Sequence, residues 1–209
     1  MFMAGTEGGK IFRCFFDMND LQAKEFQRAL AGGEMREKQD LRCPIKEASY
    51  LPHAGSVYSM DCSPYQRDLF LSAGADGSVR LYHALRQQPL LTLEPTAQQL
   101  YTVQWSPSKP LVFAAAGGDG RVYLYDLLQT TDVIRPALVL DAGNLIDSPT
   151  YALAFNSKKS ELLATGDAAG IKVWRLPGNL ADSKRGEGAY LRKLAACDDA
   201  AEVLRLLTR

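Results

Sequence analysis

Two glycine-rich segments are the first candidates for a phosphate-binding loop. Residues 5–11 read GTEGGKI, but the phosphate-loop pattern would need glycine in place of Ala4 and serine or threonine in place of Ile11. Residues 117–120 read GGDG between two strand-like stretches, so no helix follows whose N-terminus could hold a phosphate. Both segments therefore predict hairpin turns, where glycine adopts positive φ without steric cost.

Acid–base chemistry could use His53 and Asp61, yet no serine or cysteine nucleophile motif accompanies them. The four cysteines are scattered without a CxxC pair, and the chain has two histidines, whereas a structural zinc site needs four clustered nitrogen or sulfur ligands. We therefore expect no catalytic residue, no metal and no cofactor. We also expect free thiols in a reducing compartment.

Composition excludes two classes of partner. Lys plus Arg total 24 and Asp plus Glu total 24, so the formal net charge is zero, whereas nucleic-acid binding usually needs a basic excess. Apolar runs are shorter than the roughly 18 residues of a membrane span, and the N-terminal residues lack the pattern of a secretory signal. We expect neither a nucleic-acid nor a membrane partner.

The elements that would position these residues repeat along the chain. Residues 57–83 read VYSMDCSPYQRDLFLSAGADGSVRLYH, and residues 100–126 read LYTVQWSPSKPLVFAAAGGDGRVYLYD. Three pairs share one spacing of 43 residues: Ser63 and Ser106, Gly74 and Gly117, Tyr82 and Tyr125. A third copy, TYALAFNSKKSELLATGDAAGIKVWR, covers residues 150–175 after a longer connection.

Each copy carries the signals of short antiparallel strands. In the first copy an alternating stretch ends at Ser63-Pro64, an apolar stretch follows from Leu69, and Asp76-Gly77 marks a hairpin before a third strand. Pro89–Leu93 supplies a fourth strand. A unit of about 40–45 residues with four strands is typical of a propeller blade. We therefore predict an all-β propeller.

The copies resemble WD repeats, with Ser-Pro, Asp-Gly and an aromatic residue at the matching places. Tyrosine replaces the family's tryptophan in the first two copies. The resemblance implies a buried but partial hydrogen-bond network of His53, Ser72 and Asp76 with Tyr82. The structural positions of the blades are His53, Ser72, Asp76, Tyr82, Trp105, Asp119, Tyr125 and Trp174.

The repeats predict a partial propeller of about three blades plus a fragment over residues 1–177. The predicted parts are a blade fragment (1–16), an insertion (17–52), three blades (53–95, 96–142 and 143–177), a linker (178–188) and a C-terminal amphipathic helix (189–209). The insertion includes a short helix at Asn19–Ala31. Since WD propellers usually have seven blades, we expect the sequence to be a fragment. We expect the C-terminal helix to pack on the propeller itself, with a partner helix or fraying as alternatives.

Within WD proteins the chain resembles dynein intermediate chains, most closely the smaller one of cytoplasmic dynein-2. The motifs that carry this resemblance are HAGSVYS at His53, WSPSKPLVF at Trp105 and DGRVYLYDL at Asp119. The resemblance implies a non-catalytic scaffold that docks on the dynein heavy-chain tail and supports retrograde intraflagellar transport. It also implies other intermediate chains, light chains and the intraflagellar-transport particle as partners, in cytoplasm, cytoskeleton and cilium, including axoneme and basal body.

The candidate docking residues lie in loops between strands, at one end of the blades. Tyr65, Arg67 and Asp68 lie in one such loop, and Lys109 lies in the equivalent loop of the next repeat. Two other readings stay open: an intermediate chain of dynein-1 or axonemal dynein, and an unrelated WD adaptor such as a ubiquitin-ligase substrate receptor.

Overall fold

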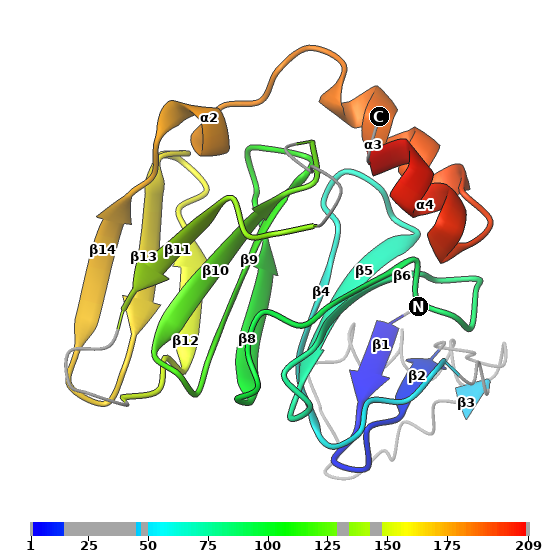
Figure 1. Cartoon of the computed structure of the whole chain (residues 1–209), viewed down its shortest axis with the longest axis horizontal. Coiled ribbons are helices and arrows are strands. Elements are labelled where there is room, and N and C mark those ends of the chain that lie inside the picture. The colour runs from blue at the N-terminus through cyan, green and yellow to red at the C-terminus, as the bar shows by residue number, and fades with distance from the viewer. Residues whose placement is uncertain (1, 15–44, 47–49, 129–133, 143–147, 208–209) are drawn as a thin grey trace, which may run out of the picture.

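The computed structural model describes residues 2–14, 45–46, 50–128, 134–142 and 148–207 of the 209-residue chain. Within these residues the strands form four antiparallel sheets, which follow one another around a common centre (Figure 1). We call the sheets blades 1 to 4, in chain order. The predicted helix at Asn19–Ala31 lies outside the described residues.

Blades 2 and 3 are complete four-stranded sheets, each a simple meander. Blade 2 contains β4 (Val57–Cys62), β5 (Leu69–Gly74), β6 (Val79–His83) and β7 (Leu91–Leu93). Blade 3 contains β8 (Leu100–Trp105), β9 (Val112–Gly117), β10 (Arg121–Asp126) and β11 (Leu138–Asp141). The all-β architecture expected from the repeats is confirmed.

Blades 1 and 4 have three strands each in the described part of the chain. Blade 1 contains β1 (Phe2–Gly5), β2 (Ile11–Cys14) and β3 (Ile45–Lys46), and blade 4 contains β12 (Ala152–Phe155), β13 (Leu162–Gly166) and β14 (Ile171–Arg175). In the part of the chain that the structure describes, β14 is the last strand of blade 4, and its Ile171 and Val173 are 79% and 66% exposed.

Two segments that were predicted to belong to the insertion are part of the blades. β3 pairs with β2 as the outer strand of blade 1. Tyr50 is buried, packs edge-on against Phe70 and Tyr82, and donates a 2.6 Å hydrogen bond to the carbonyl of Ala84. The predicted insertion limit at residue 52 is therefore wrong, because the chain has already rejoined the fold at Ile45.

The repeated aromatic residues occupy one position in the blades. Tyr82 lies opposite Phe70 in the strand register, and one repeat later Tyr125 lies opposite Phe113. In both blades the two rings stack, with centroids 5.2 Å apart. Trp174 occupies the matching place in blade 4, opposite Leu163. Residues that recur in the sequence repeat therefore occupy equivalent positions in the blades.

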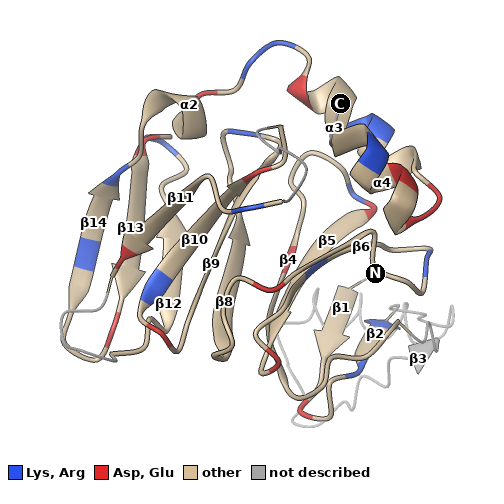
Figure 2. Cartoon of the chain, in the orientation of Figure 1, with Lys and Arg blue, Asp and Glu red and all other residues tan. Residues whose placement is uncertain are grey.

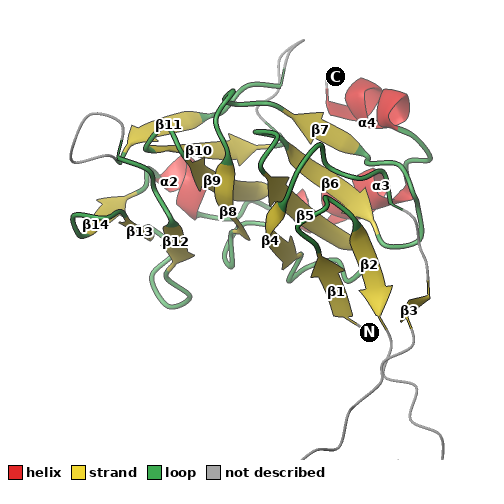
Figure 3. Cartoon of the chain, turned by 90° about the horizontal axis from the view of Figure 1, so that it is seen from below, coloured by secondary structure: helices red, strands yellow, loops and turns green. Residues whose placement is uncertain are grey.

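The inner strands β4, β8 and β12 lie next to one another at the centre, and the outer strands β7 and β11 lie at the periphery (Figure 3). Side chains of one inner strand bind the main chain of the next. Asp61 accepts a hydrogen bond from the Trp105 N–H at 2.6 Å, and Gln104 accepts one from the Phe155 N–H at 2.8 Å. Neighbouring blades are therefore joined by hydrogen bonds as well as by apolar contacts.

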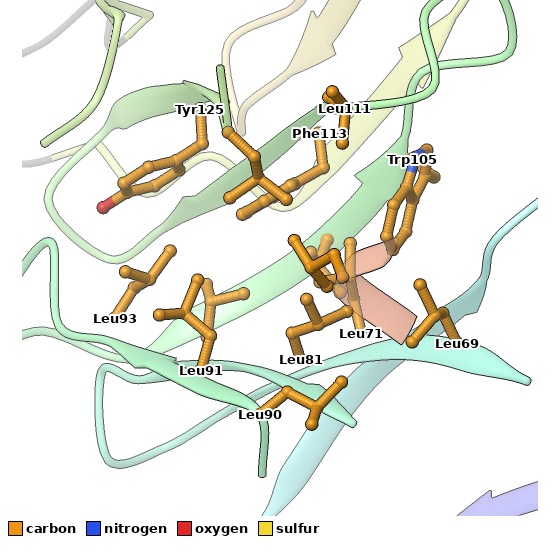
Figure 4. Packing of buried hydrophobic residues seen from close by; sticks show 14 of the residues in the cluster. Leu69, Leu71, Leu81, Leu90, Leu91, Leu93, Trp105, Leu111, Phe113 and Tyr125 are labelled. Carbon is orange, nitrogen blue, oxygen red and sulfur yellow. The ribbon is translucent and has the colours of Figure 1, made fainter. Parts of the chain in front are cut away.

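The largest apolar core fills the space between blades 2 and 3. Leucines of blade 2, such as Leu71 and Leu81, face Trp105, Phe113 and Tyr125 of blade 3 (Figure 4). Because β5 and β9 are buried on both faces, their side chains are apolar or small along the whole strand. A second core joins blade 3 to blade 4.

The C-terminal segment contains three described helices: α2 (Gly178–Ala181), α3 (Glu187–Ala196) and α4 (Ala200–Leu207). The prediction of one helix over 189–209 is wrong, since the chain is extended at Cys197. Asp199 accepts the Glu202 N–H, and the Glu202 carboxylate accepts the Asp198 N–H. These two hydrogen bonds cap the start of a new helix. None of the described helices is long and apolar enough to cross a membrane.

Helices α3 and α4 pack on the propeller, as expected for the C-terminal segment. Leu191 and Leu194 of α3 join the core between blades 2 and 3, together with Val203 and Leu207 of α4. α4 lies beside the outer strand β7 (Figure 3). The segment predicted as a plain linker, residues 178–188, includes α2, whose Leu180 is buried. The C-terminal segment is therefore an integral part of the fold.

Candidate functional site and docking surface

His53 lies at the centre of a buried polar network in blade 2. Its Nε2 is 2.7 Å from the Ser72 hydroxyl, and its Nδ1 is 2.9 Å from the Asp76 carboxylate. Because an ionised carboxylate can only accept, Nδ1 carries the proton and Ser72 donates to Nε2. Burial lowers the pKa of His53, although the hydrogen bond to Asp76 opposes this. The imidazole is thus held neutral.

Asp76 is the acceptor that organises the turn between β5 and β6. It accepts hydrogen bonds from the Ser78 hydroxyl at 2.7 Å and from the Ala54 N–H, and it pairs with Arg80 at 3.0 Å. Burial alone would raise the pKa of Asp76, but the hydrogen bonds from His53 and Ser78 lower it below its usual range. The carboxylate stays charged and holds the turn.

Tyr82 does not bind Ser72. Its hydroxyl donates to the Leu51 carbonyl at 2.8 Å and lies 3.4 Å from the Arg80 guanidinium, so it contacts the network only through Arg80. Burial raises the pKa of Tyr82. His53, Ser72 and Tyr82 are buried, and their polar groups are satisfied within the blade, so the network stabilises the blade.

The other blades use different polar groups at the equivalent places. In blade 3 the Asp119 carboxylate accepts a hydrogen bond from the Tyr123 hydroxyl, and the position equivalent to Ser72 is Ala115. In blade 4 the Trp174 indole donates to the Thr165 hydroxyl at 2.9 Å. The histidine network is therefore present in blade 2 and absent from blades 3 and 4 in the part of the chain that the structure describes.

The loop between β4 and β5 presents two of the predicted docking residues. Tyr65 is 38% exposed and Arg67 is exposed, whereas Asp68 is half-buried. Desolvation, with a smaller contribution from the Glu187 carboxylate, raises the pKa of Tyr65 to about 12. Tyr65 and Arg67 are accessible to a partner at this end of the blades.

Lys109 was predicted to meet a partner, and the structure corrects this. Its side chain is 1% exposed, and its ammonium is 2.8 Å from the Asp126 carboxylate and 3.4 Å from that of Glu187. The ammonium also donates to the Asn179 carbonyl at 2.5 Å. A buried ammonium needs such partners, because an isolated charge in the interior is strongly disfavoured. Lys109 is therefore a link inside the chain.

The C-terminal segment covers part of the end of the blades where Lys109 was predicted to meet a partner. The Ser108 hydroxyl donates to the Ala181 carbonyl at 3.0 Å, so α2 lies directly over the loop between β8 and β9. Figure 2 shows how charged residues are spread over the blades and the C-terminal helices. Glu187, the acidic residue in the first turn of α3, lies far from Lys109 along the chain, so no signal in the sequence indicated this contact.

The described residues contain no group of three or more His, Cys, Asp or Glu side chains that could hold a metal ion. Cys14, Cys62 and Cys197 are free thiols, and burial raises the pKa of Cys62 and Cys197. A raised pKa keeps a thiol protonated and unreactive.

A family model described as "WD domain, G-beta repeat" matches residues 45–83 and 87–126. The first match runs from β3 to β6, and the second runs from β7 to β10. Each therefore starts on the outer strand of one blade and ends on the third strand of the next. With its radial blades, the chain belongs to the WD40-repeat β-propeller proteins, as the sequence predicted.

Within that class, the chain is similar to cytoplasmic dynein 2 intermediate chain 2 of Homo sapiens, with 40% identity over 202 residues. It is 44% identical over 177 residues to cytoplasmic dynein 2 intermediate chain 2 of Mus musculus. These alignments cover 94% and 84% of this chain but 34% and 30% of the two relatives, so the chain spans about a third of their length. The resemblance to this intermediate chain is confirmed.

Proposed function

We propose that the chain is a non-catalytic scaffold subunit of a dynein motor complex, which docks on the dynein heavy-chain tail and supports retrograde intraflagellar transport and cilium assembly. The observation that carries this proposal is the 40% identity to a cytoplasmic dynein 2 intermediate chain over 94% of the chain. The alignment covers 94% of the chain, so it includes most of the folded body.

In the proposed role, partner proteins bind the chain and hold it in place. The blades are tied by hydrogen bonds between inner strands and by a shared apolar core, so their loops are presented on a rigid frame. A rigid surface loses little conformational entropy on binding. The buried histidine network and the protonated thiols support a role without catalysis.

The proposed docking surface is the loop between β4 and β5. Tyr65 and Arg67 are exposed there, and an aromatic residue beside an arginine is a common anchor in protein interfaces. Asp68 contributes less, because it is half-buried and its carbonyl accepts the Ala84 N–H. Lys109 is excluded from this surface because it is buried.

The proposed partners are the dynein heavy chain, other intermediate chains, light chains and the intraflagellar-transport particle. The proposed location is the cytoplasm, the cytoskeleton and the cilium, with its axoneme and basal body. Affinity purification of the tagged chain from ciliated cells tests this. Recovery of dynein-2 heavy chain with intraflagellar-transport proteins is expected. Recovery of dynein-1 or axonemal subunits alone, or of ubiquitin-ligase components, would contradict the proposal.

The same purification tests the docking loop. Arg67→Glu and Tyr65→Ala are expected to reduce recovery of heavy chain about tenfold, since anchor residues often contribute more than 1 kcal/mol to binding. The matched controls are Lys10→Glu and Tyr151→Ala, exposed residues at the opposite end of the blades. If both pairs of variants behave alike, this loop is not the docking surface.

A further inference from the structure

A groove runs along the outer side of blade 2 and has a volume of about 1050 Å³. One wall is the continuous stretch Arg86–Glu94, which contains β7. The opposite wall is formed by Asp198–Ala201 and Leu204, at the start of α4. The groove therefore follows the length of one strand, and the start of α4 forms its far side. Figure 3 shows α4 beside β7.

The wall along blade 2 can offer main-chain hydrogen bonds. β7 is the last strand of its sheet in the described part of the chain, so one row of its N–H and C=O groups is directed away from β6. An extended segment can satisfy such groups, whereas a helix satisfies its own main chain internally. The six residues Pro89–Glu94, when extended, span about 20 Å.

Part of the lining is apolar. Leu90, Leu91 and Leu93 of blade 2 are buried beneath it, and Ile134 lies at one side. Leu204 of α4 is 43% exposed and lines the same groove. An occupant with apolar side chains on one face would therefore bury surface that now contacts water.

The rim is acidic. The charged residues of the lining are Arg86, Glu94, Asp198 and Asp199. Arg86 already pairs with Asp198 at 3.0 Å, which leaves Glu94 and Asp199 without a cation in the lining. The charge complementary to this rim is positive.

We propose that this groove docks a basic, extended segment of a partner protein, which adds to the edge of β7 as a further strand. Its apolar side chains face Leu91, Leu93 and Leu204, and its lysine or arginine side chains face Glu94 and Asp199. This surface lies apart from the loop of Tyr65 and Arg67. Variants of that loop therefore leave binding at the groove unchanged, and the two proposals fail independently.

The test uses the full 209-residue chain and a fluorescein-labelled octapeptide of alternating valine and lysine, with fluorescence anisotropy as the readout. Two probes serve as comparisons: a valine–glutamate octapeptide, and the valine–lysine octapeptide N-methylated at every residue. The valine–lysine peptide is expected to bind at least about tenfold more tightly than either, because the first has the wrong charge and the second cannot pair with β7.

Variants locate the binding. Glu94→Lys and Leu204→Lys are expected to weaken binding of the valine–lysine peptide about fivefold or more. Glu7→Lys and Ile171→Lys place the same charge on distant exposed sites and are expected to leave it unchanged. Since Glu94 is exposed, its replacement leaves the fold intact even if Leu204→Lys disturbs α4.

Hydrogen exchange gives a second readout. Binding of the valine–lysine peptide is expected to slow amide exchange in Pro89–Glu94. The proposal is overturned if the acidic or the N-methylated peptide binds as tightly. It is also overturned if Glu94→Lys has no effect, or if a helical peptide of the same composition binds better.

Discussion

Asp61 of one blade accepts a 2.6 Å hydrogen bond from the main-chain N–H of Trp105 in the next blade. One repeat later, Gln104 stands where Asp61 stands and binds the Phe155 N–H in the same way. Burial raises the pKa of Asp61, and the hydrogen bond from Trp105 offsets this only in part. Because the neutral amide of Gln104 makes the equivalent bond, an acceptor oxygen is sufficient for this link.

This relationship predicts how two substitutions of Asp61 differ. Asp61→Ala leaves the Trp105 N–H without its acceptor and is expected to lower the free energy of unfolding by about 1–3 kcal/mol. Asp61→Asn keeps an acceptor oxygen and avoids a half-buried charge, so at pH 7 its free energy of unfolding is expected to match or exceed that of the parent chain. Urea denaturation measures both. A Asn variant as unstable as the Ala variant would show that the charge matters.

The histidine network predicts a pH dependence of stability. The pKa of His53 is lower in the folded chain than its usual value near 6.5, so the unfolded chain binds more protons as the pH falls. Stability is therefore fully present above the unfolded pKa and declines as the pH falls through it. We expect the free energy of unfolding to decrease between pH 7.5 and 5.5, as measured by urea denaturation.

His53 is not the sole contributor, because burial also lowers the pKa of His83. His53→Gln and His83→Gln variants separate the contributions of the two histidines to the pH dependence of stability. Each is expected to flatten the pH profile in part, and the double variant is expected to remove the decline over this range. An unchanged slope in His53→Gln would contradict the neutral, buried imidazole.

The buried cluster of Lys109 predicts a large effect of removing one charge. Lys109→Met leaves Asp126 and Glu187 buried without their cation and is expected to cost about 3–5 kcal/mol of stability. Adding Asp126→Asn and Glu187→Gln removes the uncompensated charges and is expected to restore a substantial part of the lost stability. Urea denaturation compares the variants, and no recovery in the triple variant would argue against an electrostatic cause.

The cap at the start of α4, after the break between α3 and α4, predicts how the loss of a capping side chain affects stability. Asp199→Ala removes the side-chain acceptor for the Glu202 N–H and is expected to cost about 1 kcal/mol, with faster amide exchange in the first turn of α4. Asp198→Ala is the matched control, because that exposed side chain makes a surface ion pair with Arg86. It is expected to change stability by less than about 1 kcal/mol. Equal effects of the two variants would speak against capping.

The blades were predictable because their signals are local and recur. Ser63-Pro64 and Asp76-Gly77 mark turns within a few residues of the strands they join, and the 43-residue spacing fixes their equivalence. The place of His53 beside Ser72 and Asp76 followed from the WD resemblance. The role of Arg80 in place of a Ser72–Tyr82 bond was missed, since a tyrosine hydroxyl reaches a different acceptor than an indole would.

Contacts between distant parts of the chain were not predictable in this way. Lys109 looked like a surface lysine because its partner Glu187 is far away in sequence and lies in a segment expected to be a linker. The break at Cys197 was missed because the apolar spacing of Tyr190, Leu194, Cys197 and Ala201 fits one continuous helix. The capping signal of Asp199 and Glu202 was present in the sequence, and it outweighs that spacing.

The stagger between sequence repeats and sheets, in which residues 87–126 contribute β7 to blade 2 and β8 to β10 to blade 3, gives the fold a built-in interlock. No single repeat makes a whole sheet, because each repeat supplies the outer strand of one sheet and three strands of the next. Insertions and deletions are therefore tolerated most readily when they comprise whole repeats, because every sheet then keeps its outer strand. Blade number can thus change by duplication of a unit, while a break inside one unit damages two sheets at once.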